Sequence, residues 1–221
     1  MQQASAGSMF ETLFSDEAVI RRVDRGTILH LAGAPGDRVH LLRSGLVLHV
    51  ARDASGAETI LGLSGPGEII DPASAVDGAD YQFDALTSTG CVVAGIDARR
   101  FRSALARDAA LSLAVARALA SRVRWISEAA HERSAQQVSG RVAARLLDLA
   151  RMLGRANAGS IEMELPIDQS TFARLAGTSR ESACKTLRRF KADGLVDYQG
   201  RRLRILRPDA LGYMRCAGKE R

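Results

Sequence analysis

The segment DQSTFARLAGTSRESACKTLRRFKADGLV, residues 168–196, decides the fold of this chain. Asp168 can act as the N-cap of a short helix, because its carboxylate can accept hydrogen bonds from the first free backbone N–H groups. Gly177 interrupts the helical pattern, and Ser179 can cap a second helix that runs from residue 180 to about residue 191. Two short helices joined by a glycine-containing turn of this length predict a helix-turn-helix.

The two faces of the second helix differ in chemistry. At about 100° per residue, one face is apolar and is expected to point inward with Phe172, Leu175 and Ala176 of the first helix: Ala183, Leu187 and Phe190. The other face is polar, and Arg or Lys can read guanine there while Glu can accept from cytosine. Arg189 lies further round and is expected to contact phosphate. The residues that we expect to bind DNA are Thr178, Ser179, Arg180, Glu181, Ser182, Lys185, Arg188 and Arg189.

A β-hairpin is predicted directly after the second helix. Strands at about 195–198 and 202–206 flank a turn at Gln199-Gly200-Arg201. Leu203 and Ile205 alternate with arginines and are expected to face inward. Arg201 and Arg202 at the tip are expected to contact phosphates, which completes a winged helix-turn-helix.

Positive charge is concentrated at the C-terminal end of the chain. The whole chain has 31 Lys and Arg against 25 Asp and Glu, a formal net charge of +6. Residues 168–221 hold 13 of the basic and 6 of the acidic residues, a net charge of +7, whereas residues 1–167 hold 18 against 19, a net charge of −1. The asymmetry indicates a basic module on a nearly neutral body, and together with the helix-turn-helix and its wing it predicts double-stranded DNA as the partner.

Residues 20–97 have the pattern of an antiparallel β-barrel or jelly roll. Short β-rich segments recur at regular spacing between glycine-rich turns. They lie at 19–23, 27–31, 39–43, 46–51, 58–63, 84–86 and 91–96.

A long helix is predicted from about residue 108 to residue 137, with Asp97 and Asp108 as N-cap candidates for a short lead-in helix and the main helix. About 30 residues make a helix of roughly 45 Å, which is longer than a small barrel can cover. Two overlapping apolar stripes favour a homodimer in which one part of the helix covers the barrel and another meets a second chain; the alternative is one helix packed on its own domain. The predicted dimer residues are Leu111, Val115, Ala118, Leu119, Arg122, Val123, Trp125, Ile126 and Ala129.

A second helix at about 134–153 and a short strand at 161–165 connect the long helix to the basic module. The sequence therefore predicts an α+β chain of three parts. These are a β-roll sensor with an N-terminal helix at 1–107, a dimerisation helix at 108–137 and a winged helix-turn-helix domain at 138–221.

The sequence also excludes several classes of protein. Its 46% hydrophobic and 25% charged residues are ordinary for a globular chain. No apolar run is long enough to span a bilayer, and the start lacks the pattern of a signal peptide, so we expect a cytoplasmic protein without a membrane partner. Three distant cysteines and four unclustered histidines indicate neither a disulfide framework nor a metal site. No nucleophile or phosphate-loop motif is present, so we expect no enzyme and no catalytic residues.

At LAGTSRESACKTLRRFKADGLV the chain resembles the winged helix-turn-helix of the cyclic-AMP receptor protein / fumarate-nitrate reductase regulator (CRP/FNR) family. The upstream stretch RGTILHLAGAPGDRVHLLRSGLVLHV and the later SGAETILGLSGPGEII are similar to the β-roll sensor of that family. The resemblance extends from about Phe14 to Leu211. It implies a bacterial transcription regulator that binds two-fold symmetric DNA as a homodimer, with RNA polymerase as a further partner and the nucleoid as its location.

The resemblance also implies residue roles. Arg180 and Glu181 match the base-reading Arg and Glu of the family, and Lys185 stands where many members have a second Arg. Lys cannot make the same fork to guanine, so we expect a related but altered half-site. By the same resemblance Cys184 lies close to DNA. It is either a small residue that the site tolerates or a redox-sensitive residue whose oxidation blocks DNA binding.

The sensor departs from the family pattern of cyclic-AMP binders. The expected Glu and Arg of the cassette are replaced by Pro72 and Gln82, so a buried phosphate lacks its usual cation and we do not expect cyclic AMP. The thiolate cluster of an iron–sulfur centre is absent, and no spacing supports haem at His30, His40 or His49. The effector stays unknown, and a small apolar or aromatic one near Tyr81, Phe83 and Trp125 is an alternative. We place the effector pocket at Gly67, Glu68, Gln82, Phe83 and Trp125.

Two other functions compete with a DNA-binding regulator. One is a cyclic-nucleotide-responsive sensor whose helix-turn-helix serves as a protein-interaction module and not as a DNA reader. The other is a regulator with no effector that is controlled only by its abundance.

Overall fold

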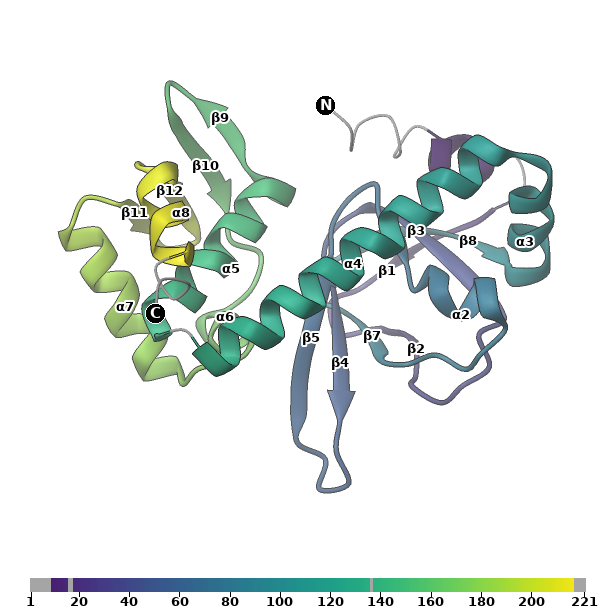
Figure 1. Cartoon of the computed structure of the whole chain (residues 1–221), viewed down its shortest axis with the longest axis horizontal. Helices are drawn as coiled ribbons and strands as arrows, with labels where there is room; N and C mark the ends of the chain where they lie inside the picture. Colours follow the sequence, from purple (N-terminus) through teal and green to yellow (C-terminus); the bar gives the residue numbers. More distant parts are fainter. Residues whose placement is uncertain (1–8, 16–17, 136, 217–221) are drawn as a thin grey trace. The chain divides into compact units, whose positions relative to one another are not determined.

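The computed structural model describes residues 9–15, 18–135 and 137–216. The chain divides into two compact units, Met1–Ile126 and Ser127–Arg221, and helix α4 (Ala109–Ala135) contributes residues to both (Figure 1). The predicted three-part division treats the long helix as a part of its own, whereas the two units divide it at residue 126. The three-part division stays a prediction. Residues 1–8 lie outside the described residues. They make up most of the N-terminal stretch in which we expect no signal peptide.

Unit 1 contains two four-stranded antiparallel sheets, as the β-roll prediction requires. The first has the order β1 (Val19–Val23), β8 (Cys91–Asp97), β3 (Arg38–Ser44), β6 (Ile69–Ile70). The second has the order β2 (Ile28–His30), β7 (Asp84–Thr87), β4 (Val47–Arg52), β5 (Glu58–Ser64). Strand β3 shows the alternation that builds the core, because Val39 and Leu41 join one buried cluster while Leu42 joins the other.

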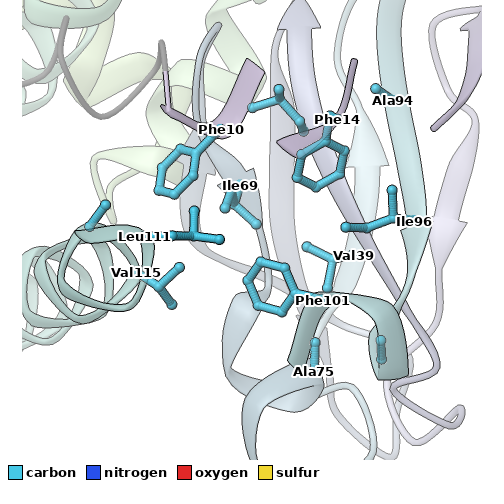
Figure 2. Close-up of a cluster of buried hydrophobic side chains, with 13 residues drawn as sticks. Phe10, Phe14, Val39, Ile69, Ala75, Ala94, Ile96, Phe101, Leu111 and Val115 are labelled. Carbon is cyan, nitrogen blue, oxygen red and sulfur yellow. The ribbon is translucent and has the colours of Figure 1, made fainter. Parts of the chain in front are cut away.

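The helices of unit 1 pack against the outer face of the first sheet. Leu111 and Val115 point from α4 toward Phe101 and Ile69 (Figure 2). Phe101 lies on α3 (Ala98–Arg107), the predicted lead-in helix, whose N-cap Asp97 accepts a hydrogen bond from the Arg99 N–H at 2.8 Å. The sequence did not predict α2 (Pro72–Asp77) or the two-residue strand β6.

The N-terminal part of α4 therefore covers its own domain, as one of the two stripes predicts. Leu111 and Val115, which we expected among the dimer residues, belong to the core of unit 1. Asp108 caps the helix by accepting from the N–H groups of Ala110 at 2.9 Å and Leu111 at 3.0 Å. Other predicted positions of α4 are open to solvent, with Val123 63% and Ile126 49% exposed.

Unit 2 packs its helices around a four-stranded antiparallel sheet of order β11-β12-β10-β9. Its helices are α5 (Val138–Leu153), α6 (Gln169–Leu175), α7 (Arg180–Ala192) and α8 (Pro208–Cys216). Its strands are β9 (Arg155–Asn157), β10 (Ser160–Glu164), β11 (Val196–Gln199) and β12 (Arg202–Ile205). Helix α5 begins later than the predicted residue 134, because α4 continues to Ala135 and the backbone of Gln137 is extended. Strand β9 was not predicted, since its three residues are all exposed.

No helix in the described part of the chain combines the length and the apolarity needed to cross a bilayer.

Candidate nucleic-acid interface and effector site

Helices α6 and α7 begin where the sequence predicts. The Asp168 carboxylate accepts from the Thr171 N–H at 2.8 Å, and the Ser179 hydroxyl accepts from the Ser182 N–H at 3.1 Å. Both predicted N-caps are therefore confirmed, and each satisfies backbone donors that a helix start leaves free. The inward residues of both helices are buried as expected: Phe172, Leu175, Ala176, Ala183, Leu187 and Phe190.

The turn between α6 and α7 is held by a residue that sequence reasoning missed. Arg141 of α5 donates from Nε to the Ala176 carbonyl at 3.1 Å and from Nη2 to the Gly177 carbonyl at 3.2 Å. Gly177 has a φ of 60°, a left-handed conformation that glycine adopts without a steric penalty. The angle between the two helices is thus fixed from α5. No local pattern indicates this role, because 35 residues separate Arg141 from Ala176.

The outward face of α7 presents unpaired charges. Arg180, Glu181 and Lys185 are exposed, and no ion pair within the described residues includes any of them. Arg188 is also exposed, and its guanidinium Nε lies 3.4 Å from the Cys184 carbonyl. A helix face with free donors and one carboxylate can form hydrogen bonds to base edges in a major groove.

Other basic side chains of unit 2 have acidic partners. Arg189 Nε lies 3.7 Å from the Asp193 carboxylate, and Lys191 Nζ lies 2.8 Å from that of Asp197. Such surface pairs contribute only ~0–1 kcal/mol to stability, so phosphates could compete for the same cations. Arg201 and Arg202 at the tip of the wing are exposed. The DNA contacts of all these residues remain predictions, as do those of Thr178 and Ser182, which are half-buried at the start of α7.

Cys184 is half-buried on α7. Its thiol donates to the Gln169 Oε1 atom at 3.3 Å, which joins α7 to the first turn of α6. The contact gives this side chain a structural role beside the redox role that the sequence suggested, and the redox role stays a prediction.

A buried ionic cluster lies beside the helix-turn-helix within unit 2. Arg145 of α5 contacts the carboxylates of Glu132 and Asp148, the latter at 3.0 Å, and its side chain is 3% exposed. Arg215 of α8 adds a second cation, with Nε 3.4 Å from Glu132 and Nη1 3.6 Å from Asp148. The cluster therefore connects α4, α5 and α8 through charges that have little access to solvent.

The structure brings two of the predicted effector residues together with a third residue from α4. His49 stacks on Phe83, with ring centroids 4.2 Å apart. The Arg122 guanidinium lies 5.9 Å from the Phe83 ring centroid and 5.1 Å from that of Trp125. Gly62 makes room for it, because a Cβ at this glycine would collide with the Arg122 guanidinium. Arg122, which we predicted as a dimer residue, therefore belongs to the sensor.

The other predicted effector residues have different surroundings. Glu68 accepts from the Gly65 N–H at 3.0 Å and so closes the turn that contains Gly67. Gln82 is exposed, and its side chain donates to the Asp80 carbonyl at 3.0 Å. The structure thus does not bring the Gln82 side chain to the Phe83, Arg122 and Trp125 side chains.

The carboxylates of Glu68 and Asp71 interact electrostatically with the Arg122 guanidinium. Burial raises the pKa of Glu68 and of Asp71, and Arg122 partly offsets this rise in both. Asp71 is only 5% exposed and has a φ of 44°, which is a strained conformation for a residue with a side chain. From the sequence we expected a phosphate in this site to lack a cationic partner. Arg122 supplies a cation that we did not foresee, because it comes from α4 and not from the β-roll.

Three histidines are buried in unit 1. The His49 Nε2 and the Ser64 hydroxyl are 2.9 Å apart, and His30 stacks on Tyr81 with centroids 3.8 Å apart. His40 lies on β3, with its ring centroid 6.5 Å from that of His30. Within the described residues, no three His, Cys, Asp or Glu side chains are grouped as a metal site would require.

Two long stretches of the chain match known domain families. Residues 20–108 match the cyclic nucleotide-binding domain, and residues 140–214 match the Crp-like helix-turn-helix domain. The chain is 30% identical over 181 residues to the CRP-like cAMP-activated global transcriptional regulator of Mycobacterium tuberculosis. The aligned residues cover 82% of this chain and 81% of that relative.

Solved structures share the fold. FixK2 from Bradyrhizobium japonicum superposes with a TM-score of 0.80 at 18% identity, covering 90% of this chain and 97% of that one. The c-di-GMP responsive global regulator CLP of Xanthomonas campestris superposes with a TM-score of 0.69 at 25% identity, covering 90% and 98%. The mycobacterial and Xanthomonas relatives are named as regulators, and the domain matches extend through both the sensor and the helix-turn-helix.

Proposed function

Because the chain belongs to the CRP/FNR family of transcription regulators, we propose that two copies bind a two-fold symmetric operator and that each copy places α7 in the major groove. One observation carries this proposal, namely the free and exposed charges of Arg180, Glu181 and Lys185 on a helix whose start is capped. Arg180 reads guanine and Glu181 accepts from cytosine. Lys185 contributes a single point contact, so the half-site differs from one read by an arginine fork.

The proposed dimer uses the solvent-exposed apolar face of α4. Leu113, Val123 and Ile126 are 51%, 63% and 49% exposed. Ala116 and Ala120 lie between them on the same side of the helix and are also exposed. Burying such a stripe against a second copy removes apolar surface from water.

A pair of matched variants tests the dimer. Val123→Glu puts a charge in the proposed interface and is expected to yield monomers, which analytical ultracentrifugation detects. Ser121→Glu puts the same charge on the exposed polar side of α4 and is expected to leave the dimer intact. Equal behaviour of the two variants would contradict this interface.

The effector of the sensor is proposed to be other than cyclic AMP. The carboxylates of Glu68 and Asp71 face the one cation, Arg122, so the site disfavours a buried phosphate anion. Among the relatives, the mycobacterial regulator is described as cAMP-activated, and the Xanthomonas regulator is described as c-di-GMP responsive. Titration with both nucleotides, followed by the midpoint of thermal unfolding, tests the proposal, since a ligand of the native state raises that midpoint.

RNA polymerase is the proposed further partner, and the bacterial nucleoid is the proposed location, because both follow from regulation at promoters. Selection of random duplex DNA by the full chain, read by sequencing, tests the central claim. A palindromic consensus is the expected result. Absence of any sequence preference at moderate salt would favour the alternative, a cyclic-nucleotide-responsive sensor with a protein-interaction module.

A further inference from the structure

A cavity of about 530 Å³ opens between the two sheets of the β-roll. Strands β1, β3 and β8 of one sheet line one side, and β2 with the segments around residues 34–37 and 81 lines the other. The volume is in the usual range of small-molecule sites. Phe83, Arg122 and Trp125 are not among its lining residues, although the cavity adjoins them through His30, whose ring centroid is 5.7 Å from that of Phe83.

Two buried imidazoles face the cavity. His30 and His40 both line it and are 7% and 8% exposed. Both ring nitrogens of His30 and the Nδ1 of His40 are buried without a hydrogen-bond partner among the described residues. An Asp71 carboxylate oxygen lies 4.0 Å from the His30 Nε2, which is beyond hydrogen-bond distance. These three nitrogens have almost no surface open to solvent, so the ring nitrogen left to meet a ligand in the cavity is the His40 Nε2.

The imidazoles are neutral at neutral pH. Burial, assisted by the neighbouring His40, lowers the pKa of His30 to about 4. Burial, assisted by Arg38 and Arg21, lowers the pKa of His40 to about 4. Each neutral ring offers one N–H donor and one acceptor, which suits a hydroxyl or another uncharged polar group.

The mouth of the cavity is cationic. Arg21 and Arg38 line it with one acid, Asp37. Tyr81 fixes the backbone of Arg38, because its hydroxyl donates to the Arg38 carbonyl at 2.8 Å and accepts from the Arg38 N–H at 3.1 Å. Guanidinium groups bind carboxylates through paired hydrogen bonds. Tyr81 and Val93, which are both buried, also line the cavity.

We propose that this cavity binds a small aromatic carboxylic acid that carries an uncharged polar group at its far end. The carboxylate lies by Arg21 and Arg38, the ring packs against Val93 and Tyr81, and the polar group bonds to the His40 Nε2. The proposal does not depend on the proposed DNA-binding function, because binding is measured on the full chain without DNA.

Histidine NMR provides a direct test, since the chain contains only four histidines. The full chain, labelled with ¹⁵N at histidine, is titrated with 4-hydroxybenzoate up to about 10 mM, where a ligand of millimolar Kd is largely bound. The ring signals of His30 and His40 are expected to shift, and that of His131 is not. Shifts centred on His49, or none at all, would overturn the proposal.

Comparison ligands separate the chemistries. The neutral amide 4-hydroxybenzamide is expected to bind about tenfold or more weakly, because it loses the charge-assisted hydrogen bonds. Binding of the amide as tight as that of the acid contradicts a carboxylate site. Shifts produced by inorganic phosphate or Zn²⁺ and not by the acid replace the proposal with an ion site.

Two pairs of variants localise the site. Arg21→Ala is expected to weaken 4-hydroxybenzoate about tenfold, whereas Arg22→Ala, next to it on β1 but outside the cavity lining, keeps wild-type affinity. Gly95→Ala narrows the cavity without a change of charge, because its Cβ would lie 3.2 Å from the His40 Cδ2 atom. Gly90→Ala is its control, with open space around the added Cβ. Equal affinity within both pairs, with unfolding midpoints unchanged, contradicts the proposal.

Discussion

Arg180 is the residue on which the proposed base recognition depends most. It is exposed at the first position of α7, where the Ser179 cap fixes the direction of the helix. Arg180→Ala is expected to cost roughly 1–3 kcal/mol of specific binding and to relax the preference at one base pair of each half-site. Fluorescence anisotropy with the selected operator and its single-base variants measures both effects. An unchanged base preference would mean that another face of α7 reads the DNA.

His40 makes stability depend on pH. The pKa of its buried imidazole is lowered to about 4 in the folded state, so between pH 4 and 6.5 the unfolded chain binds more protons. The free energy of unfolding therefore falls as the pH falls, by about 2 kcal/mol between pH 7 and pH 5 for this one group. Glu68 and Asp71, whose pKa is raised, act in the opposite direction just above their ordinary pKa.

The variant His40→Gln isolates this contribution, because glutamine keeps hydrogen-bonding groups but does not titrate in this range. Urea unfolding followed by the fluorescence of the single tryptophan, Trp125 in unit 1, is expected to give a flatter pH profile than the wild type. A profile that falls as steeply as that of the wild type would show that His40 is not the source.

Residues with local partners could be predicted from the sequence, and residues with distant partners could not. The caps at Asp168 and Ser179 bond to backbone groups three residues away, so the pattern alone indicates them. The position of Arg122 fits the spacing of a helix stripe. The residues next to it in the sequence do not indicate that its guanidinium lies against Phe83 of the β-roll. For the same reason the sequence missed that Arg141 supports the turn of the helix-turn-helix.

At the scale of elements, the ionic cluster of unit 2 joins helices that the sequence treats as separate. Arg145 has a 3% exposed side chain between Glu132 of α4 and Asp148 of α5. Arg145→Met is expected to cost about 3–5 kcal/mol of stability, because it removes the buried cation between the two carboxylates and leaves them the longer contacts of Arg215. Thermal and urea unfolding followed by circular dichroism measure this cost.

Arg151→Met is the matched control for the cluster. Arg151 also contacts Asp148, at 3.6 Å, but its side chain is 61% exposed, so the pair contributes only ~0–1 kcal/mol. Equal destabilisation by the two variants would contradict a special role for the buried arginine.

Element types were predictable where the hydrophobic period is clear. The long helix, the strands of the roll and the wing all follow their patterns, with ends that match or are displaced by one or two residues. Strand β9 was missed because its residues, Arg155–Asn157, are exposed and carry no alternation; it forms only by pairing with β10. Helix α2 was missed because six residues between Asp71 and Gly78 are too few for a helical period to appear.

At the scale of the whole molecule, the separation of charge along the sequence sets how DNA binding responds to salt. Residues 168–221 carry a net charge of +7 and the rest of the chain −1, so the attraction to phosphates comes from one module of each copy. Each phosphate contact releases counterions and lowers the slope of log K against log salt by about 0.9. We therefore expect operator affinity to fall steeply with salt.

Arg201→Ala tests this attribution because it removes one wing-tip cation, exposed at the end of the β11–β12 hairpin, from each copy. Two lost phosphate contacts per dimer are expected to reduce the magnitude of the slope by about 2 and to weaken all sequences alike. Arg180→Ala, which removes a base contact, is expected to change the base preference with little change of slope. Anisotropy titrations at four or more salt concentrations separate the two variants. A slope for Arg201→Ala equal to that of the wild type would place the wing away from the DNA backbone, and the affinity would then depend on α7 alone.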